Sequence, residues 1–298
     1  MHPEPFLKWA GGKRWLAQVL ARLLSHGRGL YLEPFLGSGA CFFHLQPQAG
    51  VLADMNPHLI ETYATVRDSP NELMARLSTY SLNRHTFEYL RSLRSADPVD
   101  RAARFCYLNR AAFNGLYRVN QRGEFNVPFG CKPGTVLFNE ANVIACSKIL
   151  QRVVLANVDF EDVLSEAKSG QRLYIDPPFA TTDKAECFHR YTPKTFGWSD
   201  QLRLASAVKS VVARGAHIVI SNACHPDILR LYSDRQFRCF HVSRRCSIAA
   251  AAQYRTLRRE MLLVSRSIDV RPAEVQFFGD EVGLRIAPLT ASQLRESI

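Results

Sequence analysis

The amino-acid sequence predicts an α/β protein built on a doubly wound, seven-stranded, mostly parallel sheet, with an inserted, mainly helical segment that carries a β-hairpin. Short apolar runs such as VVLANV and HIVIS recur along the chain, and such runs are typical of strands buried on both faces of a parallel sheet. Amphipathic segments separate these runs, and this alternation is typical of doubly wound folds. The 298 residues suffice for one large domain or two modest ones.

Seven apolar segments are predicted as strands. They are residues 29–35, 50–55, 153–160, 172–177, 217–222, 237–242 and 261–265. Residues 40–49 and 200–214 have the pattern of helices that cross between parallel strands. Their alternation predicts a Rossmann-like sheet domain.

One long stretch, from about residue 58 to 144, has helical periodicity and then becomes rich in turn residues. Within it, Asn120-Gln-Arg-Gly123 separates two short apolar runs and predicts a β-hairpin in which Gly123 has a positive φ. We therefore expect a sheet domain made of residues 1–57 and 148–266, interrupted by a second domain at 58–147. The sequence gives no role to the C-terminal extension, residues 267–298.

The net charge of +11 is concentrated in two segments. Residues 84–132 hold nine basic and four acidic side chains, and residues 235–266 hold eight arginines and one acid. Two arginine-rich segments in an otherwise nearly neutral chain favour a polyanionic partner. Solvated helix faces would give the same composition, so charge alone leaves both interpretations open.

The composition excludes several classes of protein. An apolar fraction of 47% argues against disorder, and no run approaches the roughly 18 uncharged apolar residues of a membrane span. Lys8, Lys13, Arg14 and Arg22 interrupt the N-terminal apolar residues, which argues against a secretory signal, so a cytoplasmic protein is expected. Eight cysteines without C-x-x-C spacing argue against zinc.

The segment GLYLEPFLGSGACFF, residues 29–43, predicts a strand, a glycine turn and a helix start. Gly37 and Gly39 would let the backbone approach a ligand at the carboxyl end of the strand, and Asp54 after the next strand could accept both hydroxyls of a ribose. A dinucleotide fingerprint needs a third glycine where Phe42 stands, so the pattern favours an adenosine ligand without a pyrophosphate. A tight structural turn is the alternative.

Near the N-terminus, Trp9-Ala-Gly-Gly-Lys13 resembles a phosphate loop only in part. A Walker motif requires glycine and Ser or Thr where Leu7 and Arg14 stand, so ATP hydrolysis is disfavoured. The glycines could form a backbone wall against a ligand beside Trp9 and Lys13. Taken alone, the segment is better explained by a plain helix start.

The most specific segment is Leu173-Tyr-Ile-Asp-Pro-Pro-Phe179, in which a buried strand ends in an acid, two prolines and an aromatic residue. Proline fixes φ, so Asp176 and the carbonyl of Pro177 are rigid acceptors. Together they could hold the two protons of an exocyclic amine while Phe179 stacks on its ring, which is catalysis by orientation and electrostatics.

Taken in order, these segments resemble the Dam-like family of DNA adenine N6-methyltransferases, the D12 class in its alpha-group arrangement. The matching segments are FLKWAGGK (6–13), EPFLGSG (33–39), ADMN (53–56), YLNRAAFNGLYRVNQRGEFNVPFG (107–130) and DPPF (176–179), with looser matches at ISN (220–222) and RRCSIAAAAQYR (244–255). The resemblance implies methyl transfer from S-adenosylmethionine to adenine N6 in duplex DNA by base flipping, at GATC or a related site. It further implies a monomer that needs no metal.

By position, the resemblance assigns residues to three sets. The catalytic set is Asp176, Pro177, Pro178 and Phe179; the cofactor set is Trp9, Lys13, Glu33, Phe35, Gly37, Gly39, Asp54, Asp159, Phe160 and Asp176. The DNA-binding set is Arg91, Arg94, Arg110, Phe113, Asn114, Leu116, Arg118, Asn120, Arg122, Pro128, Arg244, Arg245 and Arg255. Within it, Arg118 would read guanine O6 and N7, Leu116 and Pro128 would touch bases, and Phe113 would enter the base stack. The domain at 58–147 would be the target recognition domain.

Two departures from the family pattern bear on activity. Phe179 stands where the family usually has tyrosine, and Ala249–Ala252 replace residues that are usually polar or glycine. These two departures keep open the alternative of a DNA-binding protein whose methyltransferase core is inactive. A cytosine N4 methyltransferase is a second, because a DPP-aromatic motif can orient either amine.

Overall fold

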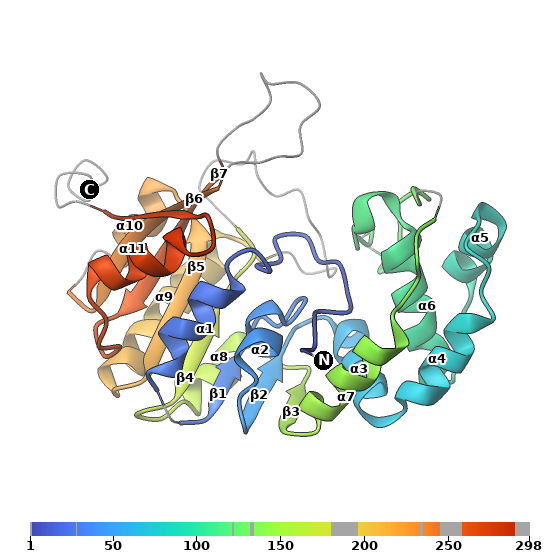
Figure 1. The fold of residues 1–298 in the computed structure, drawn as a ribbon, viewed down its shortest axis with the longest axis horizontal. Coiled ribbons are helices and arrows are strands. Elements are labelled where there is room, and N and C mark those ends of the chain that lie inside the picture. Colours follow the sequence, from blue (N-terminus) through green and yellow to red (C-terminus); the bar gives the residue numbers. More distant parts are fainter. Residues whose placement is uncertain are drawn as a thin grey trace, which may run out of the picture. The chain divides into compact units, whose positions relative to one another are not determined.

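The computed structural model describes residues 2–27, 29–120, 122–131, 134–179, 196–232, 235–244 and 258–289 (Figure 1). The first elements are α1 (Ala17–Ser25), β1 (Tyr31–Glu33), α2 (Ala40–Leu45), β2 (Gly50–Ala53), α3 (Pro57–Asp68), α4 (Pro70–Ser78), α5 (Arg84–Ser92), α6 (Pro98–Ala111), the 3-10 turn η1 (Phe113–Gly115), α7 (Glu140–Leu150) and β3 (Val153–Ala156). They are followed by α8 (Phe160–Ser165), β4 (Arg172–Ile175), α9 (Trp198–Ala213), β5 (His217–Ala223), α10 (Pro226–Leu231), β6 (Phe237–Arg244), β7 (Arg258–Ser265), α11 (Pro272–Asp280) and β8 (Arg285–Pro288).

The strands form one sheet in the order β3-β2-β1-β4-β5-β7-β6-β8. Parallel pairing joins β2 to β3, β1 to β4 and β4 to β5, whereas β7 is antiparallel to both β5 and β6. It follows that β6 runs in the direction of β5, and that the sheet is mostly parallel. The protein is therefore a mixed α/β protein, as the alternation of its apolar runs predicts.

All seven predicted strands are present, but the sheet has an eighth among the described residues. This strand, β8, pairs antiparallel with β6 and lies in the C-terminal extension. The prediction of seven strands was wrong because β8 is four residues long and buries only Ile286, which leaves no apolar run to detect.

The described chain divides into two compact units, which we treat separately. Unit 1 contains Met1–Trp15 and Glu33–Phe160, with β2, β3 and the helices α2 to α7. Unit 2 contains Leu16–Leu32 and the described residues from Glu161 onward. It holds β4 to β8 and the helices α1 and α9 to α11. The predicted division into residues 1–57 with 148–266, and 58–147, remains a prediction.

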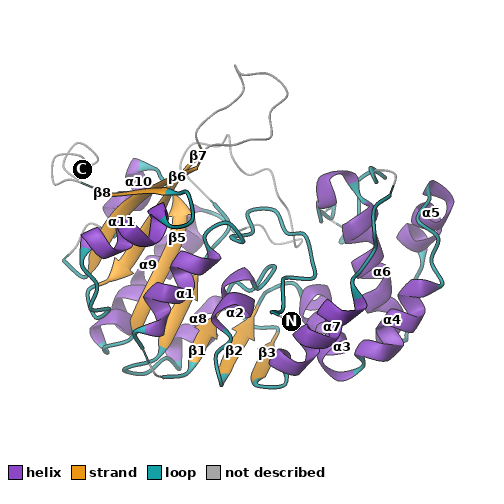
Figure 2. Ribbon diagram, in the orientation of Figure 1, coloured by secondary structure: helices purple, strands orange, loops and turns teal. Residues whose placement is uncertain are grey.

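Between β2 and β3 the described chain contains helices and turns but no strand (Figure 2). Asparagine or aspartate caps begin four of these helices, α3, α5, α6 and α7, and in α3 and α6 a proline follows at the start of the helix. Asn56 accepts hydrogen bonds from the N–H groups of His58 and Leu59 at the start of α3, and Asp97 accepts from Val99 at the start of α6.

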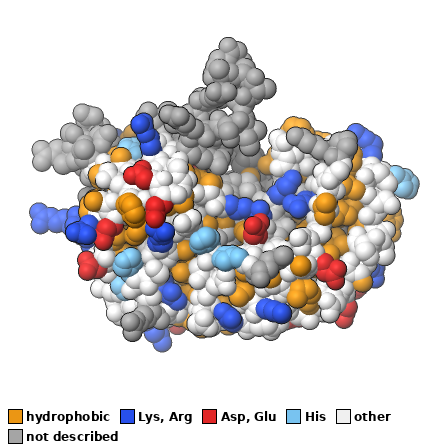
Figure 3. Space-filling model, in the orientation of Figure 1, with side chains coloured by type: hydrophobic (Ala, Val, Ile, Leu, Met, Phe, Trp, Pro, Cys, Tyr) orange, Lys and Arg blue, Asp and Glu red, His pale blue; other side chains and the backbone are white. Residues whose placement is uncertain are grey.

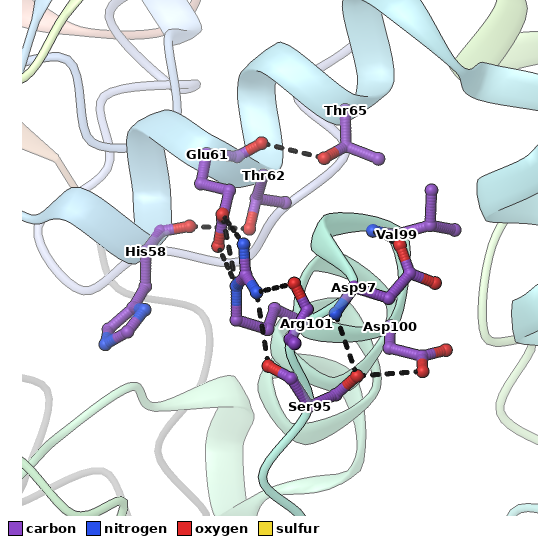
Figure 4. A network of polar contacts seen from close by, with 10 residues as sticks. His58, Glu61, Thr62, Thr65, Ser95, Asp97, Val99, Asp100 and Arg101 are labelled. Atoms are coloured by element: carbon purple, nitrogen blue, oxygen red, sulfur yellow. Dashed lines mark hydrogen bonds and ion pairs between the residues drawn. The ribbon is translucent and has the colours of Figure 1, made fainter.

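A polar network joins α3 to α6 inside unit 1 (Figure 4). The guanidinium of Arg101 donates to both carboxylate oxygens of Glu61, with Nε–O distances of 2.9 and 3.1 Å, and to the carbonyl of Ser95. Charge-assisted forked pairs of this kind are the stronger class of hydrogen bond. The network therefore fixes α6, which leads directly into η1 and the hairpin.

Candidate active site

Asp54 follows β2 and fixes the glycine turn of unit 1. Its Oδ2 accepts from the N–H of Gly37 at 3.1 Å, and its Oδ1 accepts from the N–H of Asn56 at 2.9 Å. Gly37 and Gly39 have positive φ angles of 47° and 62°, which glycine adopts without strain. Each carboxylate oxygen keeps a lone pair beyond its backbone bond, so Asp54 can still accept hydroxyl groups.

The environment of Asp54 opposes its negative charge. Burial raises the pKa of its carboxyl from 3.8 to about 6, although the two backbone hydrogen bonds act in the opposite direction. Desolvation is the dominant cause because a charged carboxylate loses its hydration there. Asp54 therefore changes its protonation state near neutral pH.

Trp9 lies directly against the glycine turn. A Cβ atom added to Gly37 would lie 2.8 Å from Cδ1 of Trp9, and one added to Gly12 would lie 3.0 Å from the Trp9 carbonyl oxygen. Lys13, 3% exposed, donates from Nζ to the carbonyl of Gly11 at 2.7 Å. Gly37 thus allows its backbone to approach the Trp9 indole closely, and Gly12 allows a close approach to the Trp9 carbonyl. The backbone wall against a ligand remains a prediction.

The remaining predicted cofactor residues, apart from Asp176, also lie in unit 1. Phe35 and Phe160 stack with ring centroids 5.4 Å apart and planes inclined by 25°. Asp159 precedes Phe160 and is half-buried, and Glu33 at the end of β1 is 2% exposed. Phe160 is buried and Phe35 is half-buried, so Phe35 is the ring of the pair that can offer an apolar surface to a planar group.

Two residues that the sequence did not single out connect Trp9 to the hairpin. The Asn109 side chain on α6 accepts from the Lys8 N–H at 2.9 Å and donates to the Lys8 carbonyl at 2.7 Å. Tyr117, next to Arg118, stacks on Trp9 at 5.9 Å and 15°. No local pattern marks these roles, because the partners are a hundred residues apart.

In unit 2, Asp176 follows the last residue of β4 and is half-buried. Its Oδ1 accepts a hydrogen bond from Oγ of Ser221 on β5 at 2.7 Å. Ser221 in turn lies 2.8 Å from the hydroxyl of Tyr174. Pro177 is buried, whereas Pro178 and Phe179 are half-buried.

The predicted hairpin is present in unit 1. Val119 pairs antiparallel with Phe125, and the N–H of Asn120 donates to the carbonyl of Glu124 at 2.9 Å. Gly123 has the expected positive φ, 75°. The exposed Arg118 donates from Nε to Oδ1 of Asn126 at 2.8 Å, which directs its guanidinium along the hairpin.

Phe113 is presented to solvent by an unusual backbone. The side chain is 52% exposed, and the next two residues, Asn114 and Gly115, have φ angles of 54° and 65°. A Cβ at Gly115 would lie 2.3 Å from Cδ of Lys8, and one at Gly130 would lie 2.4 Å from Cα of Phe113. Gly115 and Gly130 therefore allow the backbone turn that leaves the Phe113 side chain exposed.

The other predicted DNA-binding residues differ in how free their side chains are. Asn120 is used by the turn, since its Oδ1 accepts from the N–H groups of Arg122 and Glu124. Arg91 pairs with Glu88, and Arg94 donates to the carbonyls of Ser92 and Leu93. Arg110 donates to the Val136 carbonyl. Arg122 and Pro128 are exposed, and Leu116 is half-buried.

The predicted DNA-binding residues near the C-terminal part of the sheet are not described in full. Arg245, Arg255 and Ala249–Ala252 lie outside the described residues, and Arg244 is described only as the backbone end of β6.

Lys and Arg side chains on the face in Figure 3 form small groups with acidic side chains among them, not one continuous basic surface. Some of the arginines therefore form ion pairs within the protein, as Arg101 does with Glu61.

Residues 9–248 match the family model described as D12 class N6 adenine-specific DNA methyltransferase. The chain belongs to this family. The match includes the glycine turn, Asp54, the hairpin and the DPPF segment, so the family resemblance and the predicted enzyme class, an adenine-specific DNA methyltransferase, are confirmed.

Individual D12 class relatives cover most of the chain. The type II methyltransferase M1.LlaDCHI of Lactococcus lactis subsp. cremoris is 35% identical over 242 residues, which are 78% of this chain and 85% of the relative. The type II methyltransferase M.MjaIII of Methanocaldococcus jannaschii is 36% identical, over 78% and 89% of the two chains. A DNA adenine methylase of Escherichia coli is 33% identical over 90% of this chain and 98% of its own.

No helix in the described part of the chain is long and apolar enough to cross a membrane. Within the same residues, no three or more His, Cys, Asp or Glu side chains form a group that could hold a metal ion.

Proposed function

We propose that this D12 class enzyme transfers a methyl group from S-adenosylmethionine to adenine N6 in duplex DNA, at GATC or a closely related site. The observation that carries the proposal is the DPPF segment, whose Asp176 is an accessible acceptor fixed at the end of β4 by Ser221. A rigid acceptor in this position suits an exocyclic amine, which needs orientation and no strong base.

The residues of unit 1 fit the proposed cofactor. Asp54 has free lone pairs for the ribose hydroxyls, the ring of Phe35, stacked on Phe160, suits adenine, and the glycine turn against Trp9 permits close backbone contact. When bound, S-adenosylmethionine supplies an electrophilic methyl group on a sulfonium. The negative charge of Asp54 also favours a cationic ligand over a neutral one.

The proposed chemistry of unit 2 requires Asp176 and the Pro177 carbonyl to accept the two N6 protons of adenine. These bonds localise the amino lone pair, so that nitrogen can attack the methyl carbon while the bond from carbon to sulfur breaks. After transfer, the N6 nitrogen carries a positive charge and would lose one proton to water or to the Asp176 carboxylate, so the proposed step needs neither a metal nor a strongly basic residue. Phe179 stacks on the adenine ring, which does not require the hydroxyl of the usual tyrosine.

The proposed recognition domain is residues 58–147. Arg118, aimed by Asn126, would read guanine, while the exposed Phe113 would fill the stack when adenine is flipped out. Asn120 supports the hairpin turn, and we therefore give it a smaller part in base contacts than Arg118. The enzyme is proposed to act as a monomer in the cytoplasm, bound to DNA.

The test is transfer of a tritiated methyl group from S-adenosylmethionine to plasmid DNA that lacks methyladenine, followed by nucleoside analysis and digestion with GATC-sensitive nucleases. Labelled N6-methyladenine with protection at GATC is expected. Label without protection would refute the GATC target alone, and labelled N4-methylcytosine would identify the cytosine alternative. Binding of cofactor and DNA without any label would identify the alternative with an inactive methyltransferase core.

A further inference from the structure

We propose that Tyr174 and Ser221 form a hydrogen-bond relay that positions Asp176 for methyl transfer, so that Ser221 is a positioning residue of this enzyme. The inference rests on the proposed role of Asp176 as the acceptor of the target amine. All three residues belong to unit 2, on the adjacent parallel strands β4 and β5 and the segment that follows β4.

The strand register brings these side chains together. Ile175 pairs with Ile220, so the next residues along the two parallel strands, Asp176 and Ser221, come opposite each other. Residues two apart along a strand share a face, which puts Tyr174 on the same face as Asp176. Ser221 is fully buried and Tyr174 is 2% exposed, so two hydroxyl groups lie behind a half-buried carboxylate.

Proton counting fixes the direction of the relay. The hydroxyl of Ser221 has one proton, which it donates to Oδ1 of Asp176 at 2.7 Å. In the bond of 2.8 Å between Ser221 and Tyr174, the tyrosine must then be the donor. Each bond polarises the next, so the relay strengthens the donation from Ser221 to Asp176.

The consequence for the reaction is orientation. A carboxylate on a short side chain rotates about its own bonds unless a second group holds it, and Ser221 holds one oxygen from the buried side. In the proposed site, Asp176 accepts the target amine through a lone pair other than the one that takes the bond from Ser221. A misplacement of this acceptor reduces the rate steeply because the proposed catalysis depends on geometry.

The relay also gives separate roles to the segment Ile220-Ser-Asn222. Ile220 is buried in the sheet, Ser221 holds Asp176, and Asn222 points to the other face, where its Nδ2 donates to Oε1 of Gln201 at 3.3 Å. Of these three, Ser221 is the residue that donates a side-chain hydrogen bond to the proposed catalytic segment.

The test is the single-turnover rate of methyl transfer, measured together with the Kd values for DNA and S-adenosylmethionine. Ser221→Ala is expected to lower the rate about 10- to 100-fold, since a hydrogen bond to a charged group is lost. Both Kd values should change by less than about twofold, because the buried serine touches neither ligand in the proposed site. An unchanged rate in this variant would overturn the proposal.

Two comparisons separate positioning from a loss of structure. Ser221→Thr and Ser221→Val have nearly the same shape, and only the threonine keeps the hydroxyl, so the threonine variant is expected to be at least about tenfold faster. The matched control is Ser265→Ala, which removes another fully buried serine of the same sheet, one that accepts from the Ile218 N–H at 2.9 Å. It should lower the Tm without lowering the rate. An equal rate loss in the control would mean a structural role for Ser221.

A double variant tests the relay itself. Tyr174→Phe is expected to lower the rate a few-fold in the wild-type background and to have no further effect with Ser221→Ala, because the tyrosine acts through the serine. Additive losses would refute the relay. Asp176→Asn separates this inference from the proposed function: full activity in that variant would refute the role of Asp176, whereas an inactive Asp176→Asn with a fully active Ser221→Ala would refute only the relay.

Discussion

Asn109 binds the backbone of Lys8 through both ends of its side-chain amide, accepting from the N–H at 2.9 Å and donating to the carbonyl at 2.7 Å. The side-chain amide of Asn109 thus bonds the N–H and the carbonyl of Lys8, as the backbone of a neighbouring strand would do in a sheet. It attaches the segment that carries Trp9 and Lys13 to α6, within one unit and close in sequence to the hairpin. We therefore expect the cofactor segment and the DNA-reading segment to depend on the same residue.

Asn109→Ala is expected to weaken both S-adenosylmethionine binding and target discrimination. It should lower the free energy of unfolding by about 1–3 kcal/mol, because the buried Asn109 amide no longer makes two hydrogen bonds to the part-buried backbone of Lys8. Calorimetry and methylation of matched and mismatched duplexes measure these effects. Asn142→Ala is the control, since Asn142 makes the same pair of bonds to Glu4 at an exposed position. Equal losses of cofactor affinity in both variants would contradict a specific role for Asn109.

The affinity for S-adenosylmethionine is expected to depend on pH through Asp54, whose pKa burial raises to about 6. Its ionised fraction increases as the pH rises through 6, so the affinity should increase by about tenfold between pH 5 and pH 7. Asp54→Asn should bind more weakly and lose this dependence. A variant that retained the wild-type pH profile would assign the titration to another group.

The raised pKa of Asp54 is expected to make the folded protein less stable as the pH rises, whereas cofactor affinity is expected to increase. Between the ordinary value of 3.8 and the native value of about 6, the native state binds more protons at Asp54 than the unfolded state does. The contribution of Asp54 to the free energy of unfolding should therefore fall as the pH rises through this window. Urea unfolding of the wild type and of Asp54→Asn at pH 4, 5, 6 and 7 would measure the difference.

Arg118→Ala is expected to relax the sequence preference, reducing discrimination at one guanine by about 1–3 kcal/mol, because a guanidinium can bind O6 and N7 of that base together. Methylation rates on duplexes with single substitutions at each target position measure it. Arg122→Ala removes the same charge from the same hairpin and should weaken binding to all duplexes alike. Unchanged preference in Arg118→Ala would refute the assignment.

Phe113→Ala is expected to reduce base flipping with little change in stability, since the side chain is 52% exposed. Fluorescence of 2-aminopurine at the target position reports flipping, and the signal on binding should fall. Tyr89→Ala on α5 removes another exposed aromatic side chain and should leave the signal unchanged. A full signal in Phe113→Ala would show that another group fills the stack.

The sequence by itself predicted the seven strands, the hairpin with Gly123 in a left-handed conformation, and the family, because these depend on local periodicity, turn residues and contiguous motifs. It missed β8, since a short edge strand with one buried residue has no apolar pattern. Asp54 and Asp176 were recognisable because each follows a buried apolar run.

The surroundings of Asp54 and Asp176 were decided only by the tertiary structure. The bonds of Asn109 to Lys8, of Ser221 to Asp176 and of Asn126 to Arg118 join residues from different elements or opposite strands. Their partners are set by strand register and packing, and a side-chain amide or hydroxyl is suited to many partners. The raised pKa of Asp54 likewise depends on burial, which no single residue type encodes.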